Sequence, residues 1–248
     1  MTDIVALQLY TVRDETALDF KKTIRRVAEI GYGGVEFAGY GDLPAKELAA
    51  LLNETGLKAV GTHVPLAALD SDLEHQIEYS LEIGCSFLVL PWIDKQLLLN
   101  DESFKQVTTK LNAFGQHCKK HNLTFGYHNH NFEFEQVGNE TLLERLVAAT
   151  DPDLVKLELD TYWAAYAGVD PVELIQRYTG RVASLHLKDM TPERTFTEVG
   201  AGTLDIATYI EAGQAAGVKI YIVENDRPTI PSLESARKSF DNMHRSLT

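Results

Sequence analysis

The sequence predicts an α/β fold in which eight parallel strands close into a (β/α)8 barrel of the TIM type. Short runs of apolar, β-branched or aromatic residues alternate along the whole chain with longer segments of helical spacing. The length of 248 residues lies in the range in which α/β barrels form a single unit. No linker or low-complexity tract divides the chain, so we expect one domain over residues 1–248.

Eight runs are predicted to be strands. Because a helical segment separates each run from the next, the strands must be parallel, since a crossover between parallel strands needs a dozen or so residues. The predicted strands are Ile4–Leu9, Gly34–Phe37, Leu57–His63, Ser86–Pro91, Leu123–His128, Leu154–Asp160, Arg181–Leu187 and Val218–Glu224.

The segments between these runs predict helices, some with recognisable ends. Gly31 follows the first helix as a stop signal, and Pro44 stands in the first turn of the second, with Gly56 after its end. The predicted helices are Asp14–Ile30, Pro44–Thr55, Asp70–Ile83, Asp101–His121, Glu140–Ala149, Pro171–Tyr178, Leu204–Ala216 and Pro231–Met243.

A doubly wound open sheet is the competing arrangement. It normally contains fewer strand–helix units, and no Gly-x-Gly-x-x-Gly motif follows the first predicted strand. Eight units close into a barrel without leaving a sheet edge, so the sequence favours the barrel.

Composition excludes several functional classes. The formal net charge of −13 and the lack of a Lys/Arg cluster argue against nucleic-acid binding. No apolar run approaches the length of a membrane span, so we expect no membrane partner. Cys85 and Cys118 have neither metal-motif nor disulfide-framework spacing. No signal peptide is visible at the N-terminus, and we therefore expect a cytoplasmic location.

Polar residues gather where the predicted strands end, which is where a parallel barrel has its active site. Because side chains alternate along a strand, His128 and His130 share a face, and two further pairs do the same. The strand-end residues are Glu36, His63, His128, His130, Glu158, Asp160, His186, Lys188 and Glu224.

Such a cluster would be costly to bury unpaired, and one divalent cation would satisfy it. Mixed imidazole and carboxylate ligands suit Mn²⁺, Mg²⁺, Zn²⁺ or Fe²⁺, and the sequence does not choose among them. Simpler roles compete with metal binding. A strand-end histidine can form structural hydrogen bonds, Glu158 can pair with Lys156 or Lys188, and Trp92 and Trp163 can serve packing alone. The joint placement on adjacent strands favours the metal site.

Six segments in order give the chain a resemblance to the xylose isomerase-like TIM-barrel superfamily, and within it to sugar phosphate isomerase/epimerase-like proteins. The resemblance covers nearly the whole chain. The segments are Gly-Val-Glu-Phe-Ala-Gly (34–39), Gly-Thr-His-Val-Pro (61–65), Gly-Tyr-His-Asn-His-Asn-Phe-Glu-Phe (126–134), Glu-Leu-Asp-Thr-Tyr-Trp (158–163), Leu-His-Leu-Lys-Asp-Met (185–190) and Tyr-Ile-Val-Glu-Asn-Asp (221–226).

The ketose 3-epimerases of this superfamily hold one divalent metal through Glu, Asp, His and Glu. By resemblance Asp160, His186 and Glu224 match the last three, and His128 stands where the first Glu is expected, which implies the ligand set His128, Asp160, His186 and Glu224. The family's Asp-Thr-x-His motif has Trp163 in place of its His, and the family Arg falls on Pro192.

The resemblance implies enolisation of a keto sugar or related polyol-derived carbonyl compound, as an isomerase or epimerase, with Glu224, His128 and Lys188 as catalytic residues. A metal-bound His128 would not also be a free base, whereas His130 would be available. Inosose dehydratase-like members share Tyr-His-x-His, His-Leu-Lys-Asp and Val-Glu with this chain. A lyase is therefore the close alternative, with Lys188 or a histidine as the acid that assists the departing hydroxide.

Two further classes stay open: a non-catalytic barrel that binds sugars, and a metal-dependent DNA repair nuclease, against which the net charge of −13 counts. We expect a small sugar or polyol derivative as the partner and homo-oligomerisation as an option. The lack of a Lys/Arg cradle argues against a phosphorylated substrate.

The substrate-binding wall is predicted from the strand ends: Glu36, His63, Trp92, His130 and Glu158 would bind hydroxyls or stack on a sugar face. The segment Gly200–Gly202 is either a flexible turn or a loop whose backbone N–H groups approach the substrate and which then closes.

Overall fold

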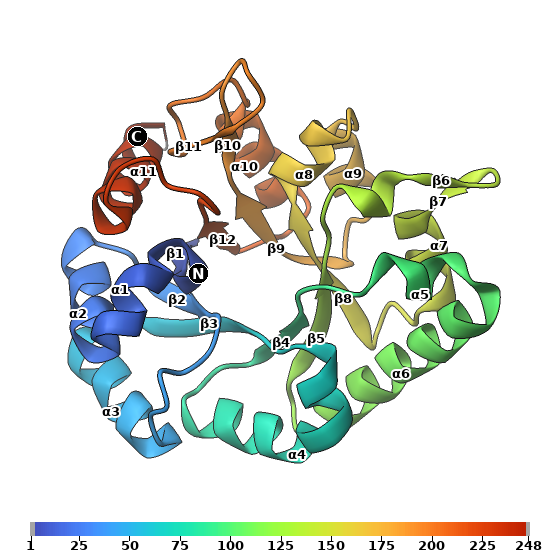
Figure 1. Ribbon diagram of the computed structural model, residues 1–248, viewed down its shortest axis with the longest axis horizontal. Coiled ribbons are helices and arrows are strands. Elements are labelled where there is room, and N and C mark those ends of the chain that lie inside the picture. Colours follow the sequence, from blue (N-terminus) through green and yellow to red (C-terminus); the bar gives the residue numbers. More distant parts are fainter. Residues whose placement is uncertain (1–2, 247–248) are drawn as a thin grey trace.

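A computed structural model describes residues 3–246 and contains a closed barrel of eight parallel strands, which confirms the predicted fold (Figure 1). The ring runs in chain order and closes where the first strand pairs with the last, with Ile4 opposite Ile220. The barrel strands are β1 (Ile4–Gln8), β2 (Gly34–Phe37), β3 (Lys58–His63), β4 (Phe87–Leu90), β5 (Thr124–His128), β8 (Val155–Asp160), β9 (Val182–Leu187) and β12 (Ile220–Val223).

Each of these strands lies inside one of the eight predicted strand segments. Residues 1, 2, 247 and 248, which the predicted domain 1–248 includes, lie outside the described residues. Among residues 3–246, the structure contains no helix with the length and apolar character that a membrane crossing requires.

Helices surround the barrel on its outer face (Figure 1). They are α1 (Arg13–Leu18), α2 (Phe20–Ile30), α3 (Ala45–Thr55), α4 (Leu66–Glu82), α5 (Lys95–Leu99), α6 (Asp101–Lys120), α7 (Leu142–Ala149), α8 (Thr161–Tyr166), α9 (Pro171–Arg177), α10 (Ile206–Ala215) and α11 (Ser232–Ser246), with 3-10 turns η1 (Leu9–Val12) and η2 (Phe132–Phe134).

The helix predicted over Asp14–Ile30 is two helices. Asp19 adopts an extended backbone (φ −156°, ψ 94°) and its carboxylate accepts a hydrogen bond from the backbone N–H of Lys22 at 2.9 Å, which starts α2 afresh. The short helices α5 and α8 were not predicted, and α4 begins before the predicted Asp70 because it continues across a kink at Asp72.

Two small hairpins extend from the ring: β6 (Gln136–Val137) with β7 (Glu140–Thr141), and β10 (Asp189–Met190) with β11 (Phe196–Thr197). The loop that follows β11 is tied to Asp189. Its carboxylate accepts hydrogen bonds from the backbone N–H groups of Met190 (2.7 Å), Gly200 (2.9 Å), Gly202 (2.9 Å) and Leu204 (3.1 Å). The N–H groups of Gly200 and Gly202, which one of the two interpretations placed near a substrate, are therefore already bonded within the protein.

The barrel interior changes character along the strands. Near the strand starts, Ala6, Val60 and Ile222 form a small apolar cluster. On β1, Gln8 lies two residues beyond Ala6, and it pairs with Glu36 on β2. Both polar side chains are fully buried. The change places the polar layer at the carboxyl ends of the strands, beneath the mouth.

Glu36 fixes the residue type of its neighbour on β3. A Cβ atom built on Gly61 would lie 2.3 Å from Glu36 Oε1, closer than any normal contact. Gly61 is therefore the residue that leaves room for the Glu36 carboxylate inside the barrel.

Candidate functional site

Asp160, His186 and Glu224 come together at the mouth, with potential ligand atoms that all lie within 4.8 Å of one another. Asp160 is opposite His186 in the register of β8 and β9, and Glu224 directly follows β12. Asp160 also caps α8, because its Oδ1 accepts a hydrogen bond from the backbone N–H of Trp163 at 3.0 Å. Its Oδ2 is buried and has no hydrogen-bond partner among the described residues.

A second group contains His63, His128, Glu158 and His186, again with ligand atoms within 4.8 Å, and two of its members, His63 and His128, line the cavity at the barrel mouth. Glu158 Oε1 lies 2.7 Å from His63 Nε2 and 3.1 Å from His186 Nε2. Glu36 Oε2 lies 2.7 Å from the same nitrogen of His186. The other nitrogen of that ring, Nδ1, lies 3.0 Å from Glu224 Oε2, so His186 belongs to both groups.

Lys188 places an ammonium group among the carboxylates of the mouth. Its Nζ lies 2.8 Å from Glu224 Oε2, 2.9 Å from Asp226 Oδ1 and 3.1 Å from Asp160 Oδ2. Burial alone would lower the pKa of Lys188, but Asp160, Glu224 and Asp226 raise it well above its ordinary value. The side chain is therefore a permanent cation.

The charged partners also set the state of Glu224. Burial favours its neutral form, yet Lys188 and His186 hold the pKa of this carboxyl well below its usual range. Glu224 is consequently ionised at neutral pH although its side chain is almost fully buried.

His128, the last residue of β5, and His130, two residues beyond it, are uncharged, unlike Lys188 and Glu224. Burial, and then the charge of His186, lower the pKa of His128 well below its ordinary value. Burial and the charge of Lys188 lower the pKa of His130 to about 3. Both are neutral imidazoles at pH 7, each with a nitrogen free to accept a proton or bind a metal. The Nδ1 atoms of both are buried and have no hydrogen-bond partner among the described residues.

This buried His/Glu cluster is consistent with a divalent metal site. Three buried atoms support that conclusion. Glu36 Oε1, His128 Nδ1 and Asp160 Oδ2 form no hydrogen bond with the described residues, although Lys188 Nζ lies 3.1 Å from Asp160 Oδ2 and Glu158 Oε1 lies 3.4 Å from His128 Nδ1. Imidazole and carboxylate donors together suit several first-row divalent ions and do not select one.

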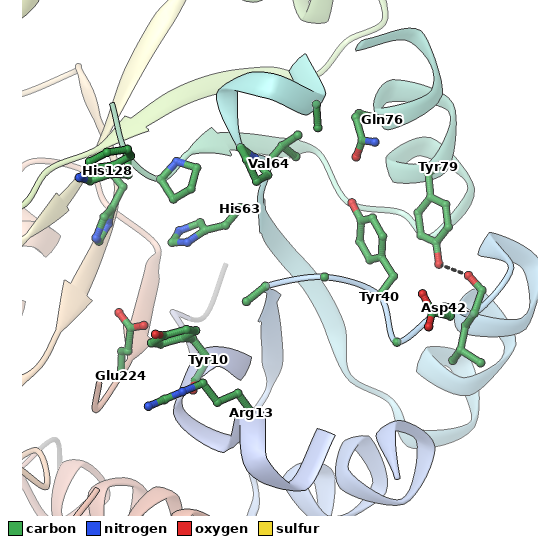
Figure 2. A pocket seen from close by; sticks show the side chains of 18 of the residues that line it. Tyr10, Arg13, Tyr40, Asp42, His63, Val64, Gln76, Tyr79, His128 and Glu224 are labelled. Atoms are coloured by element: carbon green, nitrogen blue, oxygen red, sulfur yellow. Dashed lines mark hydrogen bonds between the residues drawn. The ribbon is translucent and has the colours of Figure 1, made fainter. Parts of the chain in front are cut away.

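A cavity of about 1500 Å³ opens above the cluster, and Figure 2 shows His63, His128 and Glu224 at one end of it. His130, Lys188 and Asp226 also line this floor. Trp92, on the segment after β4, lines the wall with 52% of its surface exposed. A ligand on the floor would therefore meet ionisable groups below and an aromatic ring beside it.

The structure gathers the predicted residues in a different grouping from the one expected. His128 falls in the group of His63, Glu158 and His186, and its Nε2 also lies 3.6 Å from Asp160 Oδ2 of the other group. Glu36 and Glu158, predicted to bind substrate, are fully buried and do not line the cavity, because each is paired with His186 beneath the floor. The prediction of direct substrate contact is therefore unsupported for these two residues.

Sequence reasoning missed three partners. Gln8 donates a hydrogen bond to Glu36 Oε2 at 2.8 Å, and Asp226 contributes the third carboxylate around Lys188. Glu133 is fully buried, accepts hydrogen bonds from the Tyr127 hydroxyl and, at 2.8 Å, from the backbone N–H of His130, and thereby fixes the segment that carries His130. Only Asp226 had a visible signal, since it stands directly after the strand-end Glu-Asn pair.

Residues 24–246 match the family described as xylose isomerase-like TIM barrel. The chain belongs to this family. Two curated relatives are named inosose dehydratase: one from Geobacillus kaustophilus is 27% identical over 191 residues, and one from Clostridium perfringens is 30% identical over 148 residues. These matches cover 68% and 60% of this chain, and 61% and 46% of the two relatives, so the chain spans about half of their length.

Among solved structures of the xylose isomerase-like fold, a sugar phosphate isomerase/epimerase from Parabacteroides distasonis is similar along the whole barrel. It is 25% identical, with a TM-score of 0.82, and the superposition covers 97% of this chain and 93% of that one. The resemblance stated from the sequence motifs is thereby confirmed.

Proposed function

We propose that this protein is a divalent-metal-dependent isomerase or epimerase that enolises a keto sugar or a related polyol-derived carbonyl compound. The observation that carries the proposal is the meeting, on one cavity floor, of the Glu224 carboxylate, the neutral imidazoles of His128 and His130, and the Lys188 ammonium. Enolisation needs a base beside a carbonyl and positive charge beside the oxygen, and the floor offers both.

In the proposed reaction Glu224 removes the proton next to the carbonyl, since it is the ionised carboxylate that lines the cavity. His130 lines the same floor and, as a neutral imidazole without an acidic proton to return, would bind a substrate hydroxyl. Lys188 donates hydrogen bonds toward the developing negative charge and keeps Glu224 in place. Glu224 itself would return the proton to the neighbouring carbon, which balances an isomerisation; an epimerisation needs in addition a protonated group on the opposite face of the carbon.

The metal would be held by His128, Asp160, His186 and Glu224, since the last three offer ligand atoms within 4.8 Å of one another and His128 Nε2 lies 3.6 Å from Asp160 Oδ2. A divalent ion bound there supplies electrostatic stabilisation of the negative charge that forms on a substrate oxygen. His63 and Trp92 line the cavity and would bind hydroxyl groups and one face of the sugar. Support for a carbohydrate comes from the names of the relatives, inosose dehydratase and sugar phosphate isomerase/epimerase. A cytoplasmic location and homo-oligomerisation stay predictions.

A lyase is the second candidate, and a specific contact favours it. Lys188 Nζ lies 2.8 Å from the proposed base Glu224, so an acid and a base stand side by side on the floor. A dehydration needs one group to take the proton beside the carbonyl and another to protonate the departing hydroxide. The inosose dehydratase relatives support the same alternative.

Product analysis in D₂O with Mn²⁺ or Mg²⁺ and a panel of keto sugars and inososes tests both candidates. Deuterium at one carbon with the molecule otherwise intact supports an isomerase or epimerase, and loss of one water molecule supports a lyase. Absence of solvent exchange with every carbonyl compound in the panel contradicts both, and leaves a sugar-binding barrel as the remaining class.

A further inference from the structure

The cavity is larger than one sugar ring needs. Its volume of about 1500 Å³ exceeds the roughly 300–1,000 Å³ of pockets that enclose a drug-sized molecule. The reacting groups occupy one end only. Figure 2 shows Tyr40, Asp42, Gln76 and Tyr79 at the opposite end, beyond Val64, and we call these four residues the side lobe.

The side lobe has a defined shape. The rings of Tyr40 and Tyr79 are stacked with centroids 4.0 Å apart and an interplanar angle of 18°. Thr62 donates a hydrogen bond to the Tyr40 hydroxyl at 2.9 Å, and the Tyr79 hydroxyl donates to the carbonyl of Leu43 at 2.7 Å. Both rings are therefore fixed before any ligand arrives, which lowers the entropy cost of binding.

The loop that carries Tyr40 and Asp42 contains two glycines with positive φ values. Gly39 and Gly41 have φ values of 102° and 62°, in the region that favours glycine. A Cβ atom on Gly41 would lie 2.4 Å from the ring of Phe20, so a larger residue would displace this loop. The position of the loop next to Phe20 therefore depends on Gly41.

The polar groups on this side suit hydroxyls rather than phosphate. Asp42 is the carboxylate of the side lobe. Glu78, Glu82 and Lys46 also line the cavity, as do Arg13 and Arg227, and Figure 2 shows Arg13 beside Tyr10 rather than in the side lobe. Carboxylates only accept hydrogen bonds, so they match the hydroxyl donors of a sugar and repel an anion. Gln76 adds an amide that both donates and accepts.

Two exposed aromatic rings line the cavity, and Figure 2 shows one of them, Tyr10, near Glu224. Tyr10 and Trp92 are the aromatic side chains among the described large hydrophobics that are exposed, at 45% and 52%, and both line this cavity. Exposed apolar surface of this kind commonly marks a binding groove. The flat C–H face of a sugar ring packs well on such a ring.

We propose that the substrate is a two-ring carbohydrate, in which an uncharged second sugar ring occupies the side lobe while the carbonyl-bearing ring lies on the floor. This inference rests on the proposed function for the reacting ring. It adds that a free monosaccharide fills only part of the site.

Binding can be tested apart from turnover. Isothermal titration would compare cellobiose, maltose, lactose and trehalose with glucose, using the metal-loaded protein. We expect at least one disaccharide to bind about tenfold or more tightly than glucose, which corresponds to about 1.4 kcal/mol. Affinities of all four disaccharides within about threefold of that of glucose would overturn the proposal.

The matched variants are Asp42→Ala with Gln76→Ala in the side lobe, and Gln106→Ala on the exposed face of α6 as control. The double variant should lose most of the disaccharide preference, and the control should keep it. A crystal structure with the tightest disaccharide should place its second ring against Tyr40 and Gln76; a second ring bound elsewhere would contradict the inference.

Failure of the two proposals would be distinguishable. Glu224→Gln should abolish deuterium exchange and leave the disaccharide preference measurable. If no carbonyl compound exchanges but the preference is present, the proposed reaction is wrong and the two-ring site stands.

Discussion

The two ends of the barrel interior are equally buried and chemically opposite. At the base, Ala6 and Ile222 are 0% exposed and contact only apolar neighbours in their cluster, whereas at the mouth Glu36, Glu158 and His186 are also 0% exposed and are ionisable. An apolar base is stabilised by burial itself. At the mouth, buried charged groups are tolerated because they lie next to groups of opposite charge, since an unpaired buried charge costs several kcal/mol. The comparison indicates that the base serves stability and the mouth serves chemistry.

The largest expected effect is on activity at the mouth. Glu224→Gln keeps the shape of the side chain and removes its charge, so the rate of deuterium exchange should fall about 10²- to 10⁴-fold, the usual contribution of a general base. Circular dichroism should show an intact fold. The control is Glu234→Gln on the exposed surface of α11, where the carboxylate lies 3.5 Å from Lys238. An exchange rate within about threefold of the wild-type rate would show that Glu224 is not the base.

The reverse effect is expected at the base. Ile222→Ala should lower the free energy of unfolding by about 2–5 kcal/mol, because it leaves a cavity in a fully buried apolar cluster. The exchange rate of the folded protein should stay within about threefold. Urea titration measures the stability, and a large loss of activity without loss of stability would erase the distinction between the two ends.

The pH dependence of the free energy of unfolding gives a further test. The buried carboxyl of Glu133 accepts hydrogen bonds from two neutral groups, the Tyr127 hydroxyl and the backbone N–H of His130. Burial raises the pKa of Glu133 to about 7 from its ordinary 4.5. The folded protein therefore holds a proton that the unfolded chain has lost between these values, so this group makes stability fall as pH rises from about 4.5 to 7. The accumulated loss is about 3 kcal/mol.

Glu133→Gln removes this titration. The stability of the variant relative to wild type should rise by about 3 kcal/mol between pH 4.5 and pH 7.5, as measured by urea unfolding at a series of pH values. A constant difference across that range would mean that Glu133 titrates as an ordinary exposed acid.

The smallest effect is expected outside the barrel. Lys110 Nζ lies 2.7 Å from Asp70 Oδ2, and both side chains are more than a third exposed. Lys110→Ala should change the free energy of unfolding by less than about 1 kcal/mol and leave exchange unaffected, because water screens such a pair. A loss comparable to that of Ile222→Ala would contradict the assignment of stability to the barrel base.

Local sequence patterns were sufficient for the strands and for the strand-end residues. Strand runs such as Ile220–Val223 are apolar and rich in β-branched residues, and polar residues stand at the strand ends, so both the barrel and the positions of Asp160, His186 and Glu224 follow from the printed sequence. The short helix α8 was missed because its six residues are too few for a periodic pattern.

Pairing across the barrel could not be predicted in the same way. The contact between His63 and Glu158 joins residues 95 positions apart, and it depends on the stagger of the strands, which includes register shifts between β2 and β3 and between β8 and β9. Alternation predicts which face a side chain shares, but the depth at which Glu36 and Glu158 lie depends on that stagger. Their placement beneath the floor therefore required the structure.

The loop between β11 and α10 has a mechanical consequence. One carboxylate, that of Asp189, accepts four backbone N–H groups, and a Cβ atom on Gly202 would lie 2.3 Å from Asp189 Oδ1. Three of these bonds, from Gly200, Gly202 and Leu204, hold the loop itself, and all three must break before the loop can leave Asp189. Displacement of this segment therefore has a higher free-energy cost than displacement of a loop held by a single hydrogen bond.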